Sequence, residues 1–161
     1  MFGDIRSNCY NKQCGYNTMK FISPLKIMAS IRRQFILNLN QYRNTHYRTL
    51  NTCKINYKSY MAPQIIGSCK FKKVVCIYTV WKDSKRAFDL GNVCSVHEKF
   101  FEDALVELGK LEDDNVKFIP LVIYKEGGVD KENPRVEIEV IEINSKNKQY
   151  IYSIIDTIFD S

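Results

Sequence analysis

The segment FKKVVCIYTVWKDSKRAFDLGNVCSVHEKFFEDALVELG, residues 71–109, decides the fold because it contains an evident strand and the clearest helix of the chain. Residues 71–81 are rich in Val, Ile and Tyr and too few for a long helix, so they predict a strand. After a polar turn, apolar residues recur every three or four positions, which predicts a helix. Asn92 or Ser95 is its expected N-cap, and Gly109 is placed to end it. The expected apolar face comprises Val93, Val96, Phe100, Ala104, Leu105 and Leu108.

Further strands are predicted on both sides of this unit. The short apolar stretches 20–22 and 34–37 suit strands, and the Asn-rich residues 38–44 suit a loop. Residues 116–124 predict a strand in which Pro120 indicates a sheet edge or a bulge.

The last strand and its turn follow directly. Gly127 and Gly128 predict a turn, and residues 135–140 alternate apolar and acidic side chains as a half-buried strand does.

Two more helices are predicted, one on each side of the central unit. Residues 45–61 space their larger apolar side chains by three and four, and Pro63 is expected to close that helix. The tail has a helical apolar stripe that needs a surface, either on its own domain or across a dimer. The first stripe is Tyr47, Leu50, Cys53, Tyr57 and Tyr60; the second is Ile151, Ile154, Ile155, Ile158 and Phe159.

The expected fold class is α+β, with a small mixed sheet of about four strands packed with two main helices plus a C-terminal helix. Residues 1–18 show no sustained period and form an N-terminal extension, residues 19–143 form the domain, and residues 144–161 form the C-terminal helix.

Composition indicates a globular cytoplasmic protein. The chain is 45% hydrophobic and 26% charged, and it has neither a run of roughly 20 apolar residues nor an apolar stretch near its start. Its cysteines are therefore expected to be reduced. Cys9 and Cys14 have no second close pair, and His46 and His97 are isolated, so a structural zinc site is not favoured. The Asn, Lys and Ile usage suits a phage gene, which would place the protein in the host cytoplasm.

Charge is strongly polarised along the chain. Residues 1–88 contain 16 Lys and Arg against two acids, whereas residues 89–161 contain eight against 16. This division fits a protein that holds a polyanion with one surface and gathers carboxylates on another, although two merely solvated faces would have the same composition.

Three acids stand at the two ends of the predicted central helix. Asp89 precedes it, and Asp113 and Asp114 follow it after about 16 residues, or about 24 Å. They meet only if the flanking strands fold back beside one another or if a second subunit supplies one acid. Clustered carboxylates favour Mg²⁺ or Mn²⁺, which activate water for phosphate chemistry. The alternative is that these acids cap a helix and shape a loop.

Several separated motifs occur in a consistent order. These are Asp89-Leu-Gly-Asn92, then Lys99, then Asp103-Ala-Leu105, then Glu112-Asp-Asp114, flanked by Asn38-Leu-Asn-Gln-Tyr-Arg43 and Arg135-Val-Glu-Ile138. Over roughly residues 20–143 the chain thereby resembles the RusA-like Holliday junction resolvases, whose pattern is Asp-Leu-Asp-Asn, Lys, Asp-Ala-Leu and Asp-Asp.

The resemblance implies a RusA-like homodimer that uses Mg²⁺ to cut four-way DNA junctions by paired hydrolysis of two strands. It makes Asp89 and Asp114 metal ligands assisted by Asp113, and it places Lys99 near the scissile phosphate. The supporting residues are Asn92 and Asp103.

The chain departs from the family pattern at a metal ligand. Gly91 replaces the second Asp of Asp-Leu-Asp-Asn, Phe88 stands where a basic residue often precedes the first Asp, and about one extra helical turn precedes Asp103. Loss of one carboxylate weakens a divalent-metal site. The alternative to a nuclease is therefore a catalytically impaired relative that binds branched DNA or inhibits a DNA-processing protein.

Basic side chains of the first half provide expected DNA contacts. Tyrosines lie among them at a spacing that favours packing over base stacking. The expected DNA-binding residues are Asn40, Arg43, Arg48, Lys82, Lys85 and Arg86.

Overall fold

The computed structural model describes residues 18–159 and confirms the α+β class, with a mixed four-stranded sheet and four helices in this range. The expected N-terminal extension, Cys9 and Cys14 lie outside the described residues. The elements in chain order are β1 (Thr18–Pro24), β2 (Lys26–Ser30), β3 (Arg33–Ile36), α1 (Leu39–Asn44), α2 (Tyr47–Ile66), β4 (Val74–Lys82), α3 (Leu90–Glu107), β5 (Leu121–Val129), β6 (Arg135–Glu142) and α4 (Lys148–Phe159).

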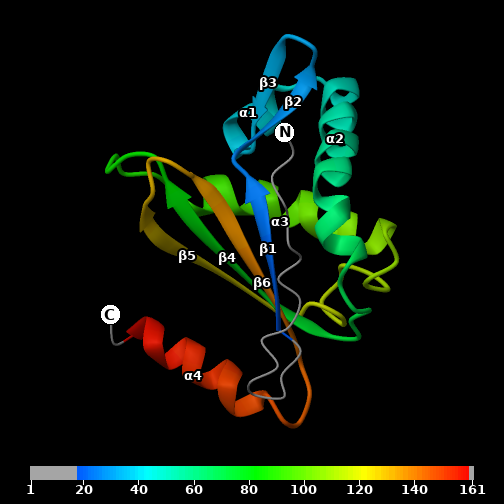
Figure 1. The fold of residues 1–161 in the computed structure, drawn as a ribbon, viewed down its shortest axis with the longest axis vertical. Coiled ribbons are helices and arrows are strands. Elements are labelled where there is room, and N and C mark those ends of the chain that lie inside the picture. The colour runs from blue at the N-terminus through cyan, green and yellow to red at the C-terminus, as the bar shows by residue number, and fades with distance from the viewer. Residues whose placement is uncertain (1–17, 160–161) are drawn as a thin grey trace.

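The main sheet has the strand order β1-β6-β4-β5 (Figure 1). β6 pairs antiparallel with both β1 and β4, whereas β4 and β5 run parallel. A parallel neighbour requires a crossover, and α3 supplies it between β4 and β5. This single parallel pair determines where the two ends of α3 lie.

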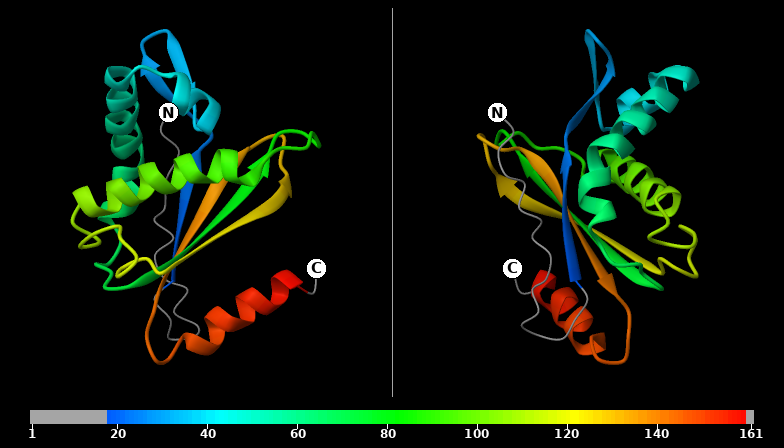
Figure 2. Two further views of the ribbon diagram at one scale, coloured as in Figure 1. Left: turned by 180° about the vertical axis from the view of Figure 1, so that it is seen from behind. Right: turned by 45° about the vertical axis from the view of Figure 1, so that its right-hand side comes forward.

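Helices cover both faces of the sheet. Figure 2 shows α2 and α3 on one side and α4 on the other. The side chains from Val74 to Val80 are all buried, because β4 has a helix on each face. On the face that α4 covers, the hydrophobic core is smaller. There Ile151 and Ile154 of α4 pack on Val75 and Ile77 of β4. The apolar stripe of the C-terminal helix therefore packs on the sheet of its own chain. The side chains of Ile158 and Phe159 are not among those that the structure describes.

The second sheet is the β2–β3 hairpin, which the sequence did not predict as a unit. The strand predicted at 20–22 is confirmed within β1, and the one at 34–37 is confirmed as β3 except for Leu37, which follows it, but β2 was missed. The hairpin lies against α2 at the top of Figure 1, where Ile27 and Phe35 are buried. β2 alternates exposed and buried residues over only five positions, too few for a clear period.

The Asn-rich loop predicted at residues 38–44 is wrong. The segment forms α1, because the side chain of Asn38 caps it and accepts a hydrogen bond from the Gln41 amide at 2.9 Å. Asn is favoured at helix N-caps as well as in loops, so an Asn-rich composition alone does not distinguish a loop from the start of a helix.

Helix α2 is longer than expected and turns a different face inward. Pro63 lies inside it and does not end it, and burial of Met61 and Ile65 on either side of Pro63 offsets the lost backbone hydrogen bond. Tyr47 and Tyr60, predicted on the apolar face, are exposed.

The central helix α3 is confirmed, but its predicted cap is wrong. Asp89, rather than Asn92 or Ser95, is the N-cap. Gly109 follows the helix with φ 70°, a conformation in which a side chain is strained, so its predicted role is confirmed.

The predicted strand 116–124 begins only at Leu121, and the predicted glycine turn is wrong. Gly127 and Gly128 lie within β5, where the register with β4 shifts beside Trp81. A Cβ on Gly127 would lie 2.6 Å from the Trp81 ring, so the glycine permits close packing. β5 is an edge strand, as Pro120 indicated.

In the range 18–159, no helix has both the length and the apolarity needed to cross a membrane.

Candidate nucleic-acid interface

The expected metal ligands lie at opposite ends of α3. Asp89 precedes the helix beyond the C-terminal end of β4, and Asp113 and Asp114 follow it on the way to the N-terminal end of β5. Because β4 and β5 are parallel, the C-terminal end of β4 and the N-terminal end of β5 lie at opposite ends of the sheet along the strand direction. The 18 residues of α3 span about 27 Å. One chain therefore does not bring Asp89 and Asp114 together.

Asp89 is exposed and builds the start of α3. Its Oδ1 accepts hydrogen bonds from the backbone amides of Gly91 at 2.9 Å and Asn92 at 3.4 Å. A Cβ on Gly91 would lie 3.3 Å from this same oxygen. A carboxylate at position 91, as in the family pattern, would therefore stand directly beside Asp89.

Asp113 and Asp114 lie in an exposed turn. Asp113 accepts a hydrogen bond from the Asp114 amide at 2.7 Å and another from the Asn115 side chain at 2.5 Å. The backbone hydrogen bond is the main reason that the pKa of Asp113 lies below its ordinary value. Asp113 thus shapes the turn, and the described residues contain no group of three or more His, Cys, Asp or Glu that could hold a metal. Within this part of one chain, the residues do not fit the expected Mg²⁺ site.

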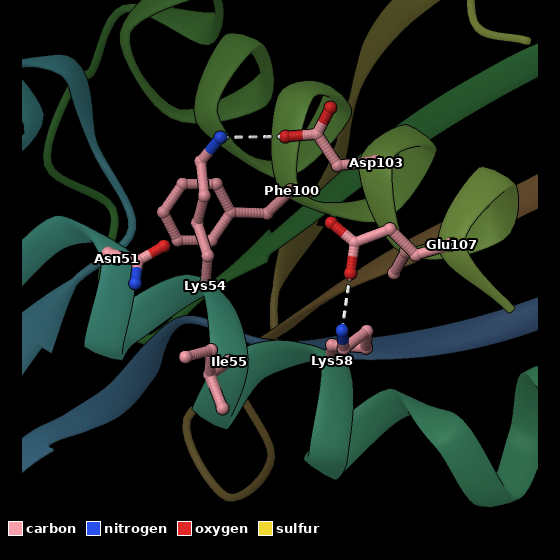
Figure 3. Close-up of a pocket in the computed structure, with 8 residues that line it drawn as sticks. Asn51, Lys54, Ile55, Lys58, Phe100, Asp103 and Glu107 are labelled. Atoms are coloured by element: carbon pink, nitrogen blue, oxygen red, sulfur yellow. Dashed lines mark hydrogen bonds and ion pairs between the residues drawn. The ribbon is translucent and has the colours of Figure 1, made fainter.

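Asp103 and Glu107, on the α2-facing side of α3, are paired with lysines of α2. Lys54 contacts Asp103 at 2.8 Å, and Lys58 contacts Glu107, across a shallow pocket floored by Phe100 (Figure 3). The expected supporting residue Asp103 therefore fastens α3 to α2. Lys99 is exposed on α3 and enters no recorded ion pair within residues 18–159.

Between α3 and the sheet lie two tyrosine–glutamate hydrogen bonds, one buried and one partly buried, that the sequence did not predict. Tyr78 of β4 donates to Glu102 at 3.2 Å, and Tyr124 of β5 donates to Glu98. Burial is the main cause that raises the pKa of Glu102 to about 8, with Glu98 next. The signal in the sequence was the spacing of Glu98 and Glu102, one turn apart on the buried side of the helix.

A second buried polar group links α3 to β1 and α2. Ser23 Oγ lies 2.8 Å from both the Tyr57 hydroxyl and His97 Nδ1. Burial lowers the pKa of His97 to about 3, so the imidazole is neutral. All three side chains are fully buried, so this group is part of the core and out of reach of a large substrate.

Three expected DNA-contact residues belong to α1 and to the start of α2, elements that lie with the β2–β3 hairpin at the top of Figure 1. Asn40 and Arg43 of α1 and Arg48 in the first turn of α2 are exposed. They are joined by Arg32 and Arg33 of the β2–β3 hairpin, which the sequence analysis missed although two adjacent arginines were visible. We call this surface the basic end; it comprises Lys26, Arg32, Arg33, Asn40, Arg43 and Arg48.

The other expected contacts lie before α3. Lys85 and Arg86 are exposed in the loop that follows β4. Lys82 already has partners within the fold: its Nζ forms an ion pair with Glu126 at 2.6 Å and lies 4.9 Å from the centre of the Phe88 ring.

Ion pairs engage some of the basic side chains in the range 18–159, and none of those at the basic end. The recorded pairs involve Lys20, Lys54, Lys58, Lys82 and Arg135. Within residues 18–159, no recorded ion pair involves a side chain of the basic end. Residues 18–82 contain no Asp or Glu that could supply one locally.

No protein-family model matches this chain. A search of curated proteins finds no match either. The likeness to RusA-like resolvases therefore rests on the short motifs and their order.

Proposed function

We propose that this protein binds branched DNA, in particular four-way junctions, through the basic end. The observation that supports this most is that the hairpin, α1 and the first turn of α2 expose four arginines in a stretch, residues 18–82, that contains no Asp or Glu. Uncompensated arginines repel one another, and a polyanion removes that repulsion by binding them. The motif order of the RusA-like family supports a junction as the form of DNA.

The second candidate is metal-dependent endonuclease activity on the same junction. It is favoured by the exposure of Asp89 and Asp114, whereas Gly91, which lacks the carboxylate of the family pattern, weighs against it. Because the two acids lie at opposite ends of α3, this activity requires a homodimer in which one subunit brings Asp114 near the partner's copy of the Asp89 loop. Mg²⁺ or Mn²⁺ would supply the Lewis-acid chemistry.

Binding is tested with a labelled four-way junction and a linear duplex of equal length, titrated at several salt concentrations with Mg²⁺ or with a chelator. We expect a junction-selective complex, and we expect Arg32→Ala/Arg33→Ala to lower the slope of log affinity against log salt by about 2. The matched control is Lys72→Ala/Lys73→Ala, which removes the same charge from two exposed lysines just before β4. Equal losses in both variants would contradict a role specific to the basic end.

Cleavage is scored in the same reactions. Paired, symmetric nicks that need Mg²⁺ and disappear in Asp114→Asn, with binding retained, would support the nuclease. Binding without nicks under every metal condition would leave a junction-binding protein, and a protein that binds no DNA would overturn both candidates and direct the search to a protein partner.

A further inference from the structure

The β2–β3 hairpin holds an isoleucine in solvent at its tip. Ser30 pairs with Arg33, so Ile31 and Arg32 form a two-residue turn. The Ile31 side chain is 96% exposed, the highest value among the large apolar side chains in the described range. Turns of this length favour Asn, Asp and Gly, so turn geometry does not account for an isoleucine here.

The tip is supported by a firmly anchored hairpin. Phe35 of β3 is buried and stacks on Phe100 of α3, with ring centres 6.2 Å apart. The Asn56 side chain of α2 donates to the Met28 carbonyl at 2.7 Å. Figure 1 shows the hairpin projecting beyond the sheet at the top of the molecule. A rigid, projecting element loses little conformational entropy when it binds.

The surroundings of the tip are basic. Arg32 and Arg33 directly follow Ile31, Ser30 precedes it, and both arginines are exposed. DNA-bending proteins combine an exposed apolar side chain, which enters between bases, with basic side chains nearby that bind the DNA.

We propose that Ile31 inserts between bases at the branch point of a DNA junction, with Arg32 and Arg33 on the flanking phosphates. The inference rests on the proposed junction binding and names the contact that makes it selective. Insertion requires unstacking, which is least costly where stacking is already interrupted, as it is at a branch point and not within a continuous duplex.

The test uses a four-way junction with 2-aminopurine at the branch point, whose fluorescence rises when the base unstacks. We expect the full-length protein to raise the fluorescence. Ile31→Ala should abolish the rise and weaken junction binding about tenfold, without weakening duplex binding. Ile31→Leu should keep both properties. The matched control is Ile66→Ala, which removes a 61% exposed isoleucine at the other end of α2 and should change neither.

The outcomes separate the two proposals. Junction-selective binding without a fluorescence rise, or with an equal rise in Ile31→Ala, would overturn insertion and leave junction binding intact. Absence of junction binding by the unmodified protein would overturn both. Thermal melting of each variant verifies that it is folded, as expected for a change at so exposed a position.

Discussion

The basic end and α3 use their charged side chains in opposite ways. At the basic end the arginines are exposed and enter no recorded ion pair within residues 18–159. Along α3 and the loop after it, most carboxylates have a structural partner, whether an α2 lysine, a buried tyrosine or a backbone amide. Both regions are highly charged in sequence, but only the first keeps its charge available. The proposed DNA binding therefore rests on the basic end, while most of the acids contact groups of the fold.

The largest expected effect comes from a core substitution where α3 packs against the elements that carry the basic end. Phe100 of α3 contacts Phe35, Tyr42 and Tyr57, one ring each from β3, α1 and α2. Phe100→Ala should lower the free energy of unfolding by about 3–5 kcal/mol, because it leaves a cavity where these elements meet. Urea denaturation measures this change.

The control is its exposed neighbour, Lys99→Ala, which should change the free energy of unfolding by less than about 0.5 kcal/mol. Similar losses in the free energy of unfolding for the two variants would contradict a central role for Phe100 in packing these elements together.

The second effect concerns the buried acid of α3. The folded protein raises the pKa of Glu102 from about 4.5 to about 8, so the folded state binds the proton more tightly than the unfolded state. The stability from this group is fully present below about pH 4.5 and is lost as the pH rises through about 8, by roughly 2–4 kcal/mol.

Glu102→Gln keeps the hydrogen-bonding shape and removes the titration. Denaturation from pH 5 to 8.5 should show a shallower decline in stability for the variant than for the unmodified protein. Parallel curves would mean that Glu102 ionises normally in the folded state.

The third effect sharpens the assignment of binding to the basic end. Arg43→Ala/Arg48→Ala should weaken junction binding about tenfold, or by about 1.4 kcal/mol, and reduce its salt dependence. Fluorescence anisotropy with labelled junction measures both quantities. Lys72→Ala/Lys73→Ala again controls for the loss of net charge, and an unchanged affinity in the arginine variant would remove α1 and α2 from the interface.

The smallest expected effect concerns α3, at the end that begins with Asp89. Gly91→Asp places a second carboxylate beside Asp89 in the first turn, where negative charge stabilises a helix by about 0.3–1 kcal/mol. Thermal melting with Mg²⁺ and with chelator should show a larger Mg²⁺-dependent rise for this variant than for the unmodified protein. Gly91→Asn has nearly the same shape without the charge, and an equal rise there would mean that the added carboxylate binds no metal.

Periodicity predicted the elements that bury one continuous face. The helix α3, the alternating strand 135–140 and the tail helix were confirmed, because each repeats its apolar pattern over enough residues. The strand before α3 was also confirmed, but its Val, Ile and Tyr content predicted it, since it is buried on both faces and has no period. β2 and α1 were missed because they have five and six residues, which is too short for a period to emerge.

The sequence by itself determined the α+β class, the position of the central strand and helix, and the uneven distribution of charge. Only the tertiary structure decided which charges are available. Whether β5 pairs parallel with β4, whether Lys54 reaches Asp103, and whether the β2–β3 hairpin packs on α2 depend on contacts between residues far apart in the chain. Such contacts arise when the faces of strands and helices are buried against one another, and a local pattern specifies the face to be buried but not its neighbour.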